Sequence, residues 1–426
     1  MIKEPGFLPY PSPLNRESDE AHIERASRFG NKDAIIEIMS TCDEKEIRFL
    51  GKIGELYPET TPPHTNIVEV IEIPSHHEDQ DNNSLLTNKN EVTQYVIEHE
   101  GTVIYCVFKP FDGENKNRKE ETGHNKFYSQ EAAAYIVSEA FGFDLVPPTV
   151  IRTIQGREGA LQLFIHPEEY AQWETCQDKL NITQEQIEKL ETSRDFYNMA
   201  MFDFILANAD RHQNNWLLKT RLQSGVNEHK EVDLDEVTPA TLVAIDHGET
   251  LSTYSYRFNP TKGPSRILTE IEPTQGSTGE QIDLGIPKET PLPAECIVAL
   301  KQGISLQEEV TKQLLQLEID PQEILQMWIR TYSLIHEGVF LSNRNRDHIP
   351  LPIDQTLDLM RRYISLLTTA SEDTVEYITT LSPRTIQTIL NTPLTTLRQN
   401  PSFAAIDKTV IHTLKQFNHP IIRANI

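Results

Sequence analysis

The feature that most constrains the fold is a change of pattern near residue 170 of this 426-residue chain. From about 84 to 170 the sequence shows short segments rich in β-branched and aromatic residues, separated by glycine-containing turns. One helical pattern, 129–142, interrupts them, with Ser129 as the expected N-cap and Gly142 as the expected stop. Helical periodicity dominates afterwards, as in 192–210 and 321–338. The pattern predicts an α+β fold with a small, mostly antiparallel sheet before a larger helical part.

Length, at roughly 150 residues per domain, predicts two or three structural units. The composition shifts divide the chain into an N-terminal helical extension with a linker, a β-rich unit, a helical unit and a C-terminal helical segment, at 1–83, 84–170, 171–345 and 346–426. The first unit is expected to be separate, because Pro-rich and polar runs surround its short helical patterns, such as 44–56.

Charge and cysteine usage narrow the function classes. Lys and Arg number 39 and Asp and Glu number 64, a net charge of −25, which argues against a general nucleic-acid binder and against adhesion to anionic lipid. The sequence contains neither an apolar stretch of membrane-spanning length nor an apolar signal core, so no stable membrane anchor is expected. The four cysteines are far apart, without metal or disulfide spacing, which predicts a reducing, cytoplasmic location.

The segment 202–218, FDFILANADRHQNNWLL, holds the densest set of reactive side chains. Asp210 follows a predicted helix, and Asn215 comes five residues later, before a short apolar strand. Phosphoryl transfer needs a carboxylate that orients and deprotonates the attacking hydroxyl, and an oxygen ligand for Mg²⁺ nearby. Asp246 ends the strand-like LVAID and precedes Gly248 by two residues, which suits a metal ligand on a tight turn.

Two residues of the β-rich unit complete the set. Lys109 ends the apolar segment 103–108, and a lysine there needs an anionic partner because burial without one is costly. Glu131, early in the predicted helix, is the candidate partner, and the pair would hold the ammonium against nucleotide phosphates. The order Lys109, Glu131, Asp210, Asn215, Asp246 is the order in which kinase folds use these roles. It predicts a two-lobed, protein-kinase-like fold.

Several motifs resemble the phosphatidylinositol 3-/4-kinase superfamily. The segment DFILANADRHQNNWLLK, followed by AIDHG, is similar to its catalytic and metal-binding loops. The VFKP strand and FGFDLVPPTVIR look more like type II phosphatidylinositol 4-kinases. The sequences KPFDGE, QEAAAYIVSEAFGFDLVPPTV, MAMFDFILANADRH and IDHG look most like bacterial phosphatidylinositol-kinase-like proteins. The resemblance spans about 90–250, under half of the chain.

The resemblance implies ATP and Mg²⁺ as cofactors and a role for each matched residue. Lys109 would bind the nucleotide phosphates with Glu131 as its partner, and Leu163, Phe164 and Ile165 would form the hinge that receives the adenine. The implied catalytic residues are Asp210, Arg211 and His212, with His212 beside the γ-phosphate, and the implied metal ligands are Asn215 and Asp246.

Two departures from the family pattern are visible. The expected phosphate-covering loop, within Ser84–Thr93, contains no glycine, although many kinases use glycines there for close backbone approach. The interval between Lys109 and Glu131 lacks the cysteine cluster that is palmitoylated in type II lipid kinases. The family's route to stable membrane attachment is therefore not expected in this chain.

The sequence predicts a kinase that transfers the γ-phosphate of ATP to a hydroxyl. A protein or a small soluble molecule is the favoured acceptor, because the net charge of −25 opposes work on an anionic bilayer. Phosphatidylinositol is the alternative acceptor. Two alternatives of other classes remain: a pseudokinase that serves as a binding scaffold, and a phosphohydrolase whose metal site is formed by His212, His247, Asp210 and Asp246.

Overall fold

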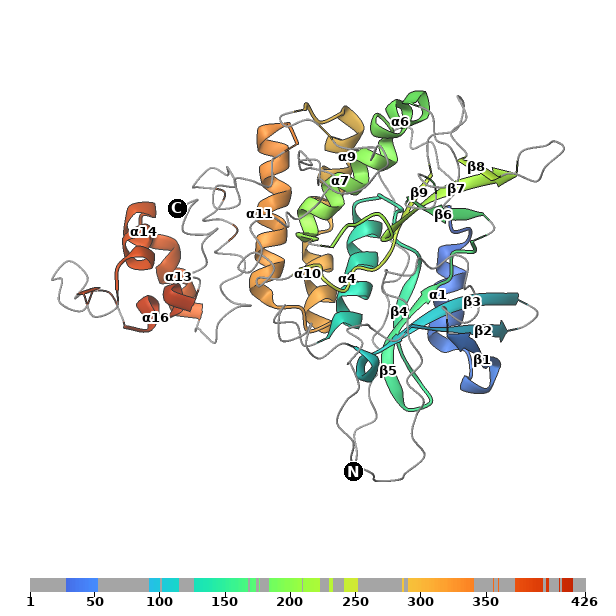
Figure 1. The fold of residues 1–426 in the computed structure, drawn as a ribbon. Helices are drawn as coiled ribbons and strands as arrows, with labels where there is room; N and C mark the ends of the chain where they lie inside the picture. The colour runs from blue at the N-terminus through green and yellow to red at the C-terminus, as the bar shows by residue number, and fades with distance from the viewer. Residues whose placement is uncertain are drawn as a thin grey trace, which may run out of the picture.

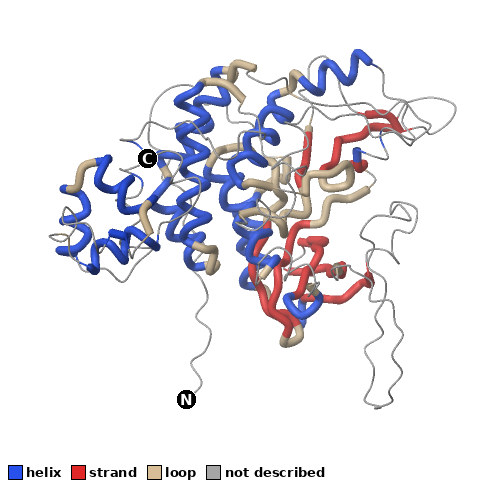
Figure 2. The backbone as a smooth tube through the Cα atoms, turned by 60° about the vertical axis from the view of Figure 1, so that its left-hand side comes forward, coloured by secondary structure: helices blue, strands red, loops and turns tan. Residues whose placement is uncertain are grey.

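The structure is a computed structural model that combines helices and sheets, which confirms the α+β class. It describes residues 28–52, 92–99, 102–114, 126–167, 169–173, 176, 184–208, 210–222, 230–232, 241–251, 286, 290–340, 355, 359, 372–393, 396–397, 406 and 408–416. Most of the predicted phosphate-covering loop and the stretch 252–285 after the predicted metal ligand lie outside the described residues. Figures 1 and 2 show the strands gathered at one side of the helices.

An antiparallel five-stranded sheet forms the β-rich part of the described chain. Its spatial order is β1–β2–β3–β5–β4, with β1 at Ile47–Lys52, β2 at Thr93–His99, β3 at Thr102–Pro110, β4 at Thr149–Ile154 and β5 at Arg157–Leu163. The short β-rich segments expected from about 84 to 170 occur as strands β2 to β5, because their β-branched and aromatic residues fill one face of the sheet. A short 3₁₀ turn, η2 (Phe111–Gly113), follows β3.

The single helix of this part, α4 (Phe127–Ala140), packs against β4 and β5 on one side and against the helical layer on the other (Figure 1). It begins two residues before Ser129, so the prediction of Ser129 as N-cap was wrong. Glu114 accepts a hydrogen bond from the Tyr128 amide at 2.7 Å instead, which satisfies a helix N-terminus from a distant residue. The predicted stop is confirmed, since Gly142 follows the helix with φ 64°.

Residues 32–52 correct the expectation that 1–83 is a separate extension. Helix α1 (Lys32–Thr41) packs on β4, and β1, reached through the 3₁₀ turn η1 (Glu44–Glu46), pairs with β2. Met39 and Cys42 are buried in one apolar cluster with Phe108 and Leu161. These residues cover the apolar face of the sheet. The helix predicted over 44–56 was wrong for residues 47–52, which form strand β1, because the local pattern does not show the strand with which they pair.

A smaller sheet and helix α7 follow. The sheet consists of β6 (Tyr170–Gln172), β7 (Trp216–Leu222), β8 (Lys230–Val232) and β9 (Leu242–Ala244), with β7 paired to each of the others. The helix, α7 (Arg194–Leu206), begins after Ser193, whose hydroxyl accepts from the Phe196 amide. It is buried on nearly all sides, which places its C-terminal end inside the molecule.

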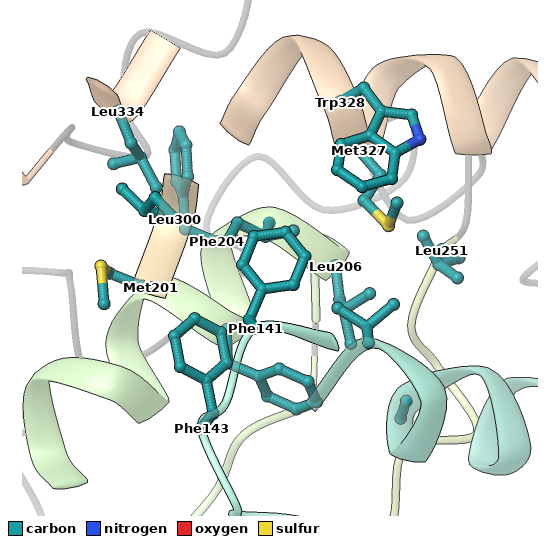
Figure 3. Close-up of a cluster of buried hydrophobic side chains, with 14 of the residues drawn as sticks. Phe141, Phe143, Met201, Phe204, Leu206, Leu251, Leu300, Met327, Trp328 and Leu334 are labelled. Carbon is teal, nitrogen blue, oxygen red and sulfur yellow. The ribbon is translucent and has the colours of Figure 1, made fainter. Parts of the chain in front are cut away.

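The helical layer forms around the largest apolar core. Helices α9 (Ala294–Ser305), α10 (Gln307–Gln316) and α11 (Pro321–Glu337) pack around α4 and α7, while α6 (Gln184–Glu191) packs on α7. Figure 3 shows Phe141, Phe204 and Trp328 meeting in this core from three different elements. Toward the C-terminus α13 (Glu372–Thr380), α14 (Pro383–Asn391) and α16 (Lys408–Gln416) form a small group of their own in Figure 1. Among the described residues no helix combines the length and apolar character needed to cross a membrane.

Candidate active site

The C-terminal end of β3 brings a lysine and two carboxylates together. Lys109 Nζ donates to Glu131 Oε1 on α4 and, at 3.2 Å, to Asp246 Oδ1 on the turn after β9. The lysine side chain is 17% exposed, the Glu131 side chain 2% and the Asp246 side chain 36%, so the set opens toward solvent on the Asp246 side. The structure therefore joins three residues that the sequence places far apart.

Burial and ion pairing shift the pKa values of Lys109 and Glu131 in opposite directions. Burial alone would lower the pKa of Lys109, but Asp246 and Glu131 together raise it above its ordinary value. Burial would raise the pKa of Glu131, but the Lys109 ammonium and the nearby His247 ring lower it below its ordinary value. The ammonium and the Glu131 carboxylate are thus both charged at neutral pH, as an ion pair that binds phosphate requires.

Gly159 on β5 permits this arrangement. A Cβ at this position would lie 2.4 Å from the backbone oxygen of Lys109 and 2.7 Å from Pro110 Cα. Only glycine allows β5 to approach β3 this closely, opposite the nucleotide-binding candidate. The sequence offered no signal for this role, because Gly159 lies in a segment, 156–159, whose glycines predicted a turn, whereas the structure places it in β5.

The loop after α7 is built on a buried aspartate of that helix. Ala207 ends α7 in the left-handed region with φ 52°, and the chain then turns back toward Asp203. Asp203 accepts from Asn208 Nδ2 at 2.9 Å and from the Arg211 guanidinium at 3.0 Å. Asn208 in turn accepts from the Asp210 amide at 3.0 Å. These contacts fix the loop before it reaches Asp210.

Arg211 connects this loop to the segment that carries Asp246. Its Nη1 donates to the backbone oxygens of Asn215 and of Ile245, the latter at 2.9 Å. The residue is 2% exposed and its ion pair with Asp203 is fully buried. The catalytic role that the resemblance implies for Arg211 does not agree with this placement, because the guanidinium faces inward and contacts the loops themselves. Its geometry is that of a positioning residue.

Asp210, His212 and Asn215 lie together on the loop. Asn215 Nδ2 donates to the Asp210 backbone oxygen at 2.7 Å, so its amide oxygen is the atom left to act as a ligand. His212 Nδ1 accepts from the Asn214 amide at 3.2 Å, which leaves Nε2 as the protonated nitrogen of a neutral ring. That nitrogen lies 3.9 Å from Asp210 Oδ2.

The donor set around Asn215 and Asp246 fits Mg²⁺. The Ile245 amide donates to the Asn215 backbone oxygen at 3.0 Å, which places the two predicted ligands on adjacent segments. One amide oxygen and one partly exposed carboxylate are hard donors, typical of a Mg²⁺ that is completed by phosphate oxygens and water. Within the part of the chain that the structure describes, no three His, Cys, Asp or Glu residues form a metal-binding group. The four residues of the phosphohydrolase alternative are all described, and they form no such group.

The predicted hinge links the two sheets. Leu163 ends β5, and the Phe164 amide donates to the Tyr105 backbone oxygen at 2.8 Å. Leu163 and Ile165 are partly buried against an apolar cluster of the second sheet, which Ile245, the residue before Asp246, also joins. The hinge candidates Leu163 and Ile165 therefore share an apolar cluster with the segment that leads to the predicted metal ligand.

The comparisons with known proteins match part of the chain that carries this site. Residues 184–272 match the family model described as Phosphatidylinositol 3- and 4-kinase. The match includes Asp210, Asn215 and Asp246 and leaves Lys109 and Glu131 outside it. No curated protein matches the chain. The resemblance predicted from the motifs is confirmed at the level of the phosphatidylinositol 3- and 4-kinase superfamily, over the part of the chain that forms both loops of the site.

Proposed function

We propose that the protein is an ATP- and Mg²⁺-dependent phosphotransferase with the two-lobed arrangement of a kinase. The observation that carries this proposal is the contact of Lys109 with Glu131 and Asp246, next to the loop of Asp210 and Asn215. The five-stranded sheet with α4 would form the small lobe, and the second sheet with the helical layer the large lobe. Leu163, Phe164 and Ile165 would bind the adenine between them.

Each side chain has a distinct task in this mechanism. Lys109, held by Glu131, would bind the nucleotide phosphates, and Asp210 would orient the acceptor hydroxyl and take its proton. The new bond forms between the acceptor oxygen and the γ-phosphorus, while the bond from that phosphorus to the β–γ bridging oxygen breaks and ADP leaves. His212 would donate from Nε2 to the transferred phosphate. Asn215 and Asp246 would hold Mg²⁺, which supplies charge neutralisation at the phosphates.

For the acceptor we favour a protein side chain or a small soluble molecule over phosphatidylinositol. A net charge of −25 repels an anionic bilayer, and membrane binding normally needs basic residues worth about 1 kcal/mol each or a lipid anchor. All four cysteines are described, and all are free and buried, which supports a reducing, cytoplasmic location and leaves none exposed for acylation.

The test is transfer of labelled γ-phosphate from ATP, offered in parallel to phosphatidylinositol vesicles and to a soluble lysate. We expect Mg²⁺-dependent labelling of protein or small molecules, and loss of several orders of magnitude in rate for Asp210→Asn, which keeps the shape but not the proton acceptor. Labelling of the vesicles alone would establish the lipid kinase instead. Background turnover by both wild type and Asp210→Asn would establish a pseudokinase scaffold.

A further inference from the structure

His247, the residue after Asp246, is a fully buried histidine with an unusual environment. Its ring packs edge-on against Phe202 of α7, with centroids 5.6 Å apart and an interplanar angle of 81°. Its Nδ1 lies 3.6 Å from Glu131 Oε2, just beyond hydrogen-bond distance. Within the described residues, neither ring nitrogen of His247 nor Glu131 Oε2 makes a hydrogen bond.

Because His247 Nδ1 and Glu131 Oε2 are both buried and face each other, we expect a hydrogen bond between them in the protein that binds its substrates. An unpaired buried donor or acceptor costs roughly 1–3 kcal/mol, and a shift of less than about 1 Å would pair these two. A neutral imidazole has one N–H to donate, and it can carry that N–H at Nδ1, which faces Glu131 Oε2. The N–H at Nδ1 can therefore meet the carboxylate oxygen that Lys109 does not use.

The role of a hydrogen bond between His247 and Glu131 follows from its place beside Lys109 and Asp246. In the structure Lys109 is shared between Glu131 Oε1 and Asp246 Oδ1. With Mg²⁺ held by Asp246 and phosphates bound by Lys109, Glu131 would lose part of its pairing, and its second oxygen would need a donor to keep the carboxylate in place. His247, on the same turn as Asp246, would provide this donor.

We propose that His247 is a positioning residue that holds Glu131 through Oε2, so that Glu131 presents Oε1 to Lys109. The contact ties α4 to the turn with the metal ligand, so that the phosphate-binding lysine and the metal site are set together. This inference rests on the proposed function for its catalytic consequence. The approach of His247 Nδ1 to Glu131 Oε2 is a property of the protein without nucleotide.

A double-mutant cycle separates this role from simple packing. His247→Phe keeps a ring against Phe202 but removes the nitrogens, and Glu131→Met keeps the length of the side chain but removes the carboxylate. We expect His247→Phe to weaken Mg-ATP binding about tenfold or more in the wild-type background and to have no further effect in the Glu131→Met background. His247→Asn, whose amide can donate from near the Nδ1 position, should retain binding within a few fold. Phe202→Leu disturbs only the packing of the His247 ring, so its effect on Mg-ATP binding should be the same in the wild-type and the Glu131→Met backgrounds.

The same four proteins of the cycle are compared by urea unfolding without nucleotide. Coupling between positions 247 and 131 in both measurements supports the inference. Equal effects of His247→Phe in the two backgrounds, or binding like that of the wild type, would overturn it. If wild type transfers no phosphate and binds no Mg-ATP, the proposed function fails, while coupling in the unfolding cycle still decides whether His247 holds Glu131.

Discussion

Asp246 shows how one residue combines a backbone and a side-chain requirement. Its φ of 57° lies in the left-handed region, which Asp and Asn tolerate better than other residues with a side chain. Asp144 has nearly the same conformation, with φ 54°, but pairs with Arg28 and Lys32 away from the site. The two aspartates form a matched pair for substitution.

Asp246→Asn should keep the turn and remove the Mg²⁺ ligand charge. The rise in melting temperature that Mg²⁺ adds to that of ATP alone should disappear, because a ligand that binds only the folded state stabilises it, and does so less as its affinity falls. Asp144→Asn, with the same backbone conformation, should keep the full Mg²⁺-dependent rise. Equal Mg²⁺-dependent shifts for wild type and Asp246→Asn would remove Asp246 from the metal site.

Gly159 should be sensitive to a single methyl group. Gly159→Ala would place a Cβ against the Lys109 backbone, so we expect the free energy of unfolding to fall by about 1–3 kcal/mol and Mg-ATP binding to weaken. Gly338, which ends α11 with φ 66° and where an added Cβ would meet no atom within 4 Å, provides the control. Gly338→Ala should cost about 1 kcal/mol of stability and leave nucleotide affinity unchanged, as measured by urea unfolding and calorimetric titration.

Among the elements, the β4–β5 hairpin has a turn sequence that is not the one most often found in its backbone conformation. Its two-residue loop, Gln155–Gly156, has φ of 51° and 78°, the conformation for which Asn-Gly is preferred. The Gln155 side chain is exposed, and its backbone amide donates to Glu44 Oε1 at 2.6 Å. A change of side chain here alters the turn preference without disturbing the core.

Gln155→Asn should therefore raise the free energy of unfolding, by about 0.5 kcal/mol, since Asn tolerates the left-handed region better than Gln. The measurement is urea unfolding followed by circular dichroism. Gln155→Ala has no such tolerance and should give no gain. A stabilisation by Ala as large as that by Asn would show that the turn conformation is not the cause.

At the scale of the whole molecule, the segment that leads into α1 connects the two sheets. Arg28 pairs with Asp144, after α4, and with the fully buried Asp195 at the start of α7. Lys32 pairs with Glu139 and Asp144. Phe29 packs in one apolar cluster with side chains of the second sheet. The chain around residue 30 thus holds α4, α7 and both sheets together through paired charges with little exposure.

These pairs predict a dependence of stability on acid. Burial would raise the pKa of Asp144, but Lys32 and Arg28 lower it below its ordinary value of 3.8. Because the unfolded chain then takes up the proton at a higher pH than the folded protein, this stabilisation is present above 3.8 and is lost as the pH falls below it. Urea unfolding between about pH 6 and about pH 3 should show a shallower loss for Asp144→Asn than for wild type. Parallel curves would contradict this role.

The sequence alone determined those helices, strands and candidate site residues that depend on neighbouring residues in the chain. Strands β2 and β3, helix α7 and the stop of α4 at Gly142 follow from alternation, helical spacing and a C-terminal glycine, which are properties of consecutive side chains. The order of Lys109, Asp210 and Asp246 and the match over 184–272 also required no tertiary information. The properties of neighbouring side chains were therefore enough to predict these elements and to select the candidate site residues.

Only the tertiary structure decided which side chains face one another. The pairing of β1 with β2, the inward direction of Arg211 and the approach of His247 to Glu131 all depend on partners distant in sequence. Lys109 and Asp246, for example, are separated by 137 positions and meet at 3.2 Å. The physical reason is that the cost of burying a charge depends on the group opposite it, and that group is set by how the elements pack rather than by the residues beside it.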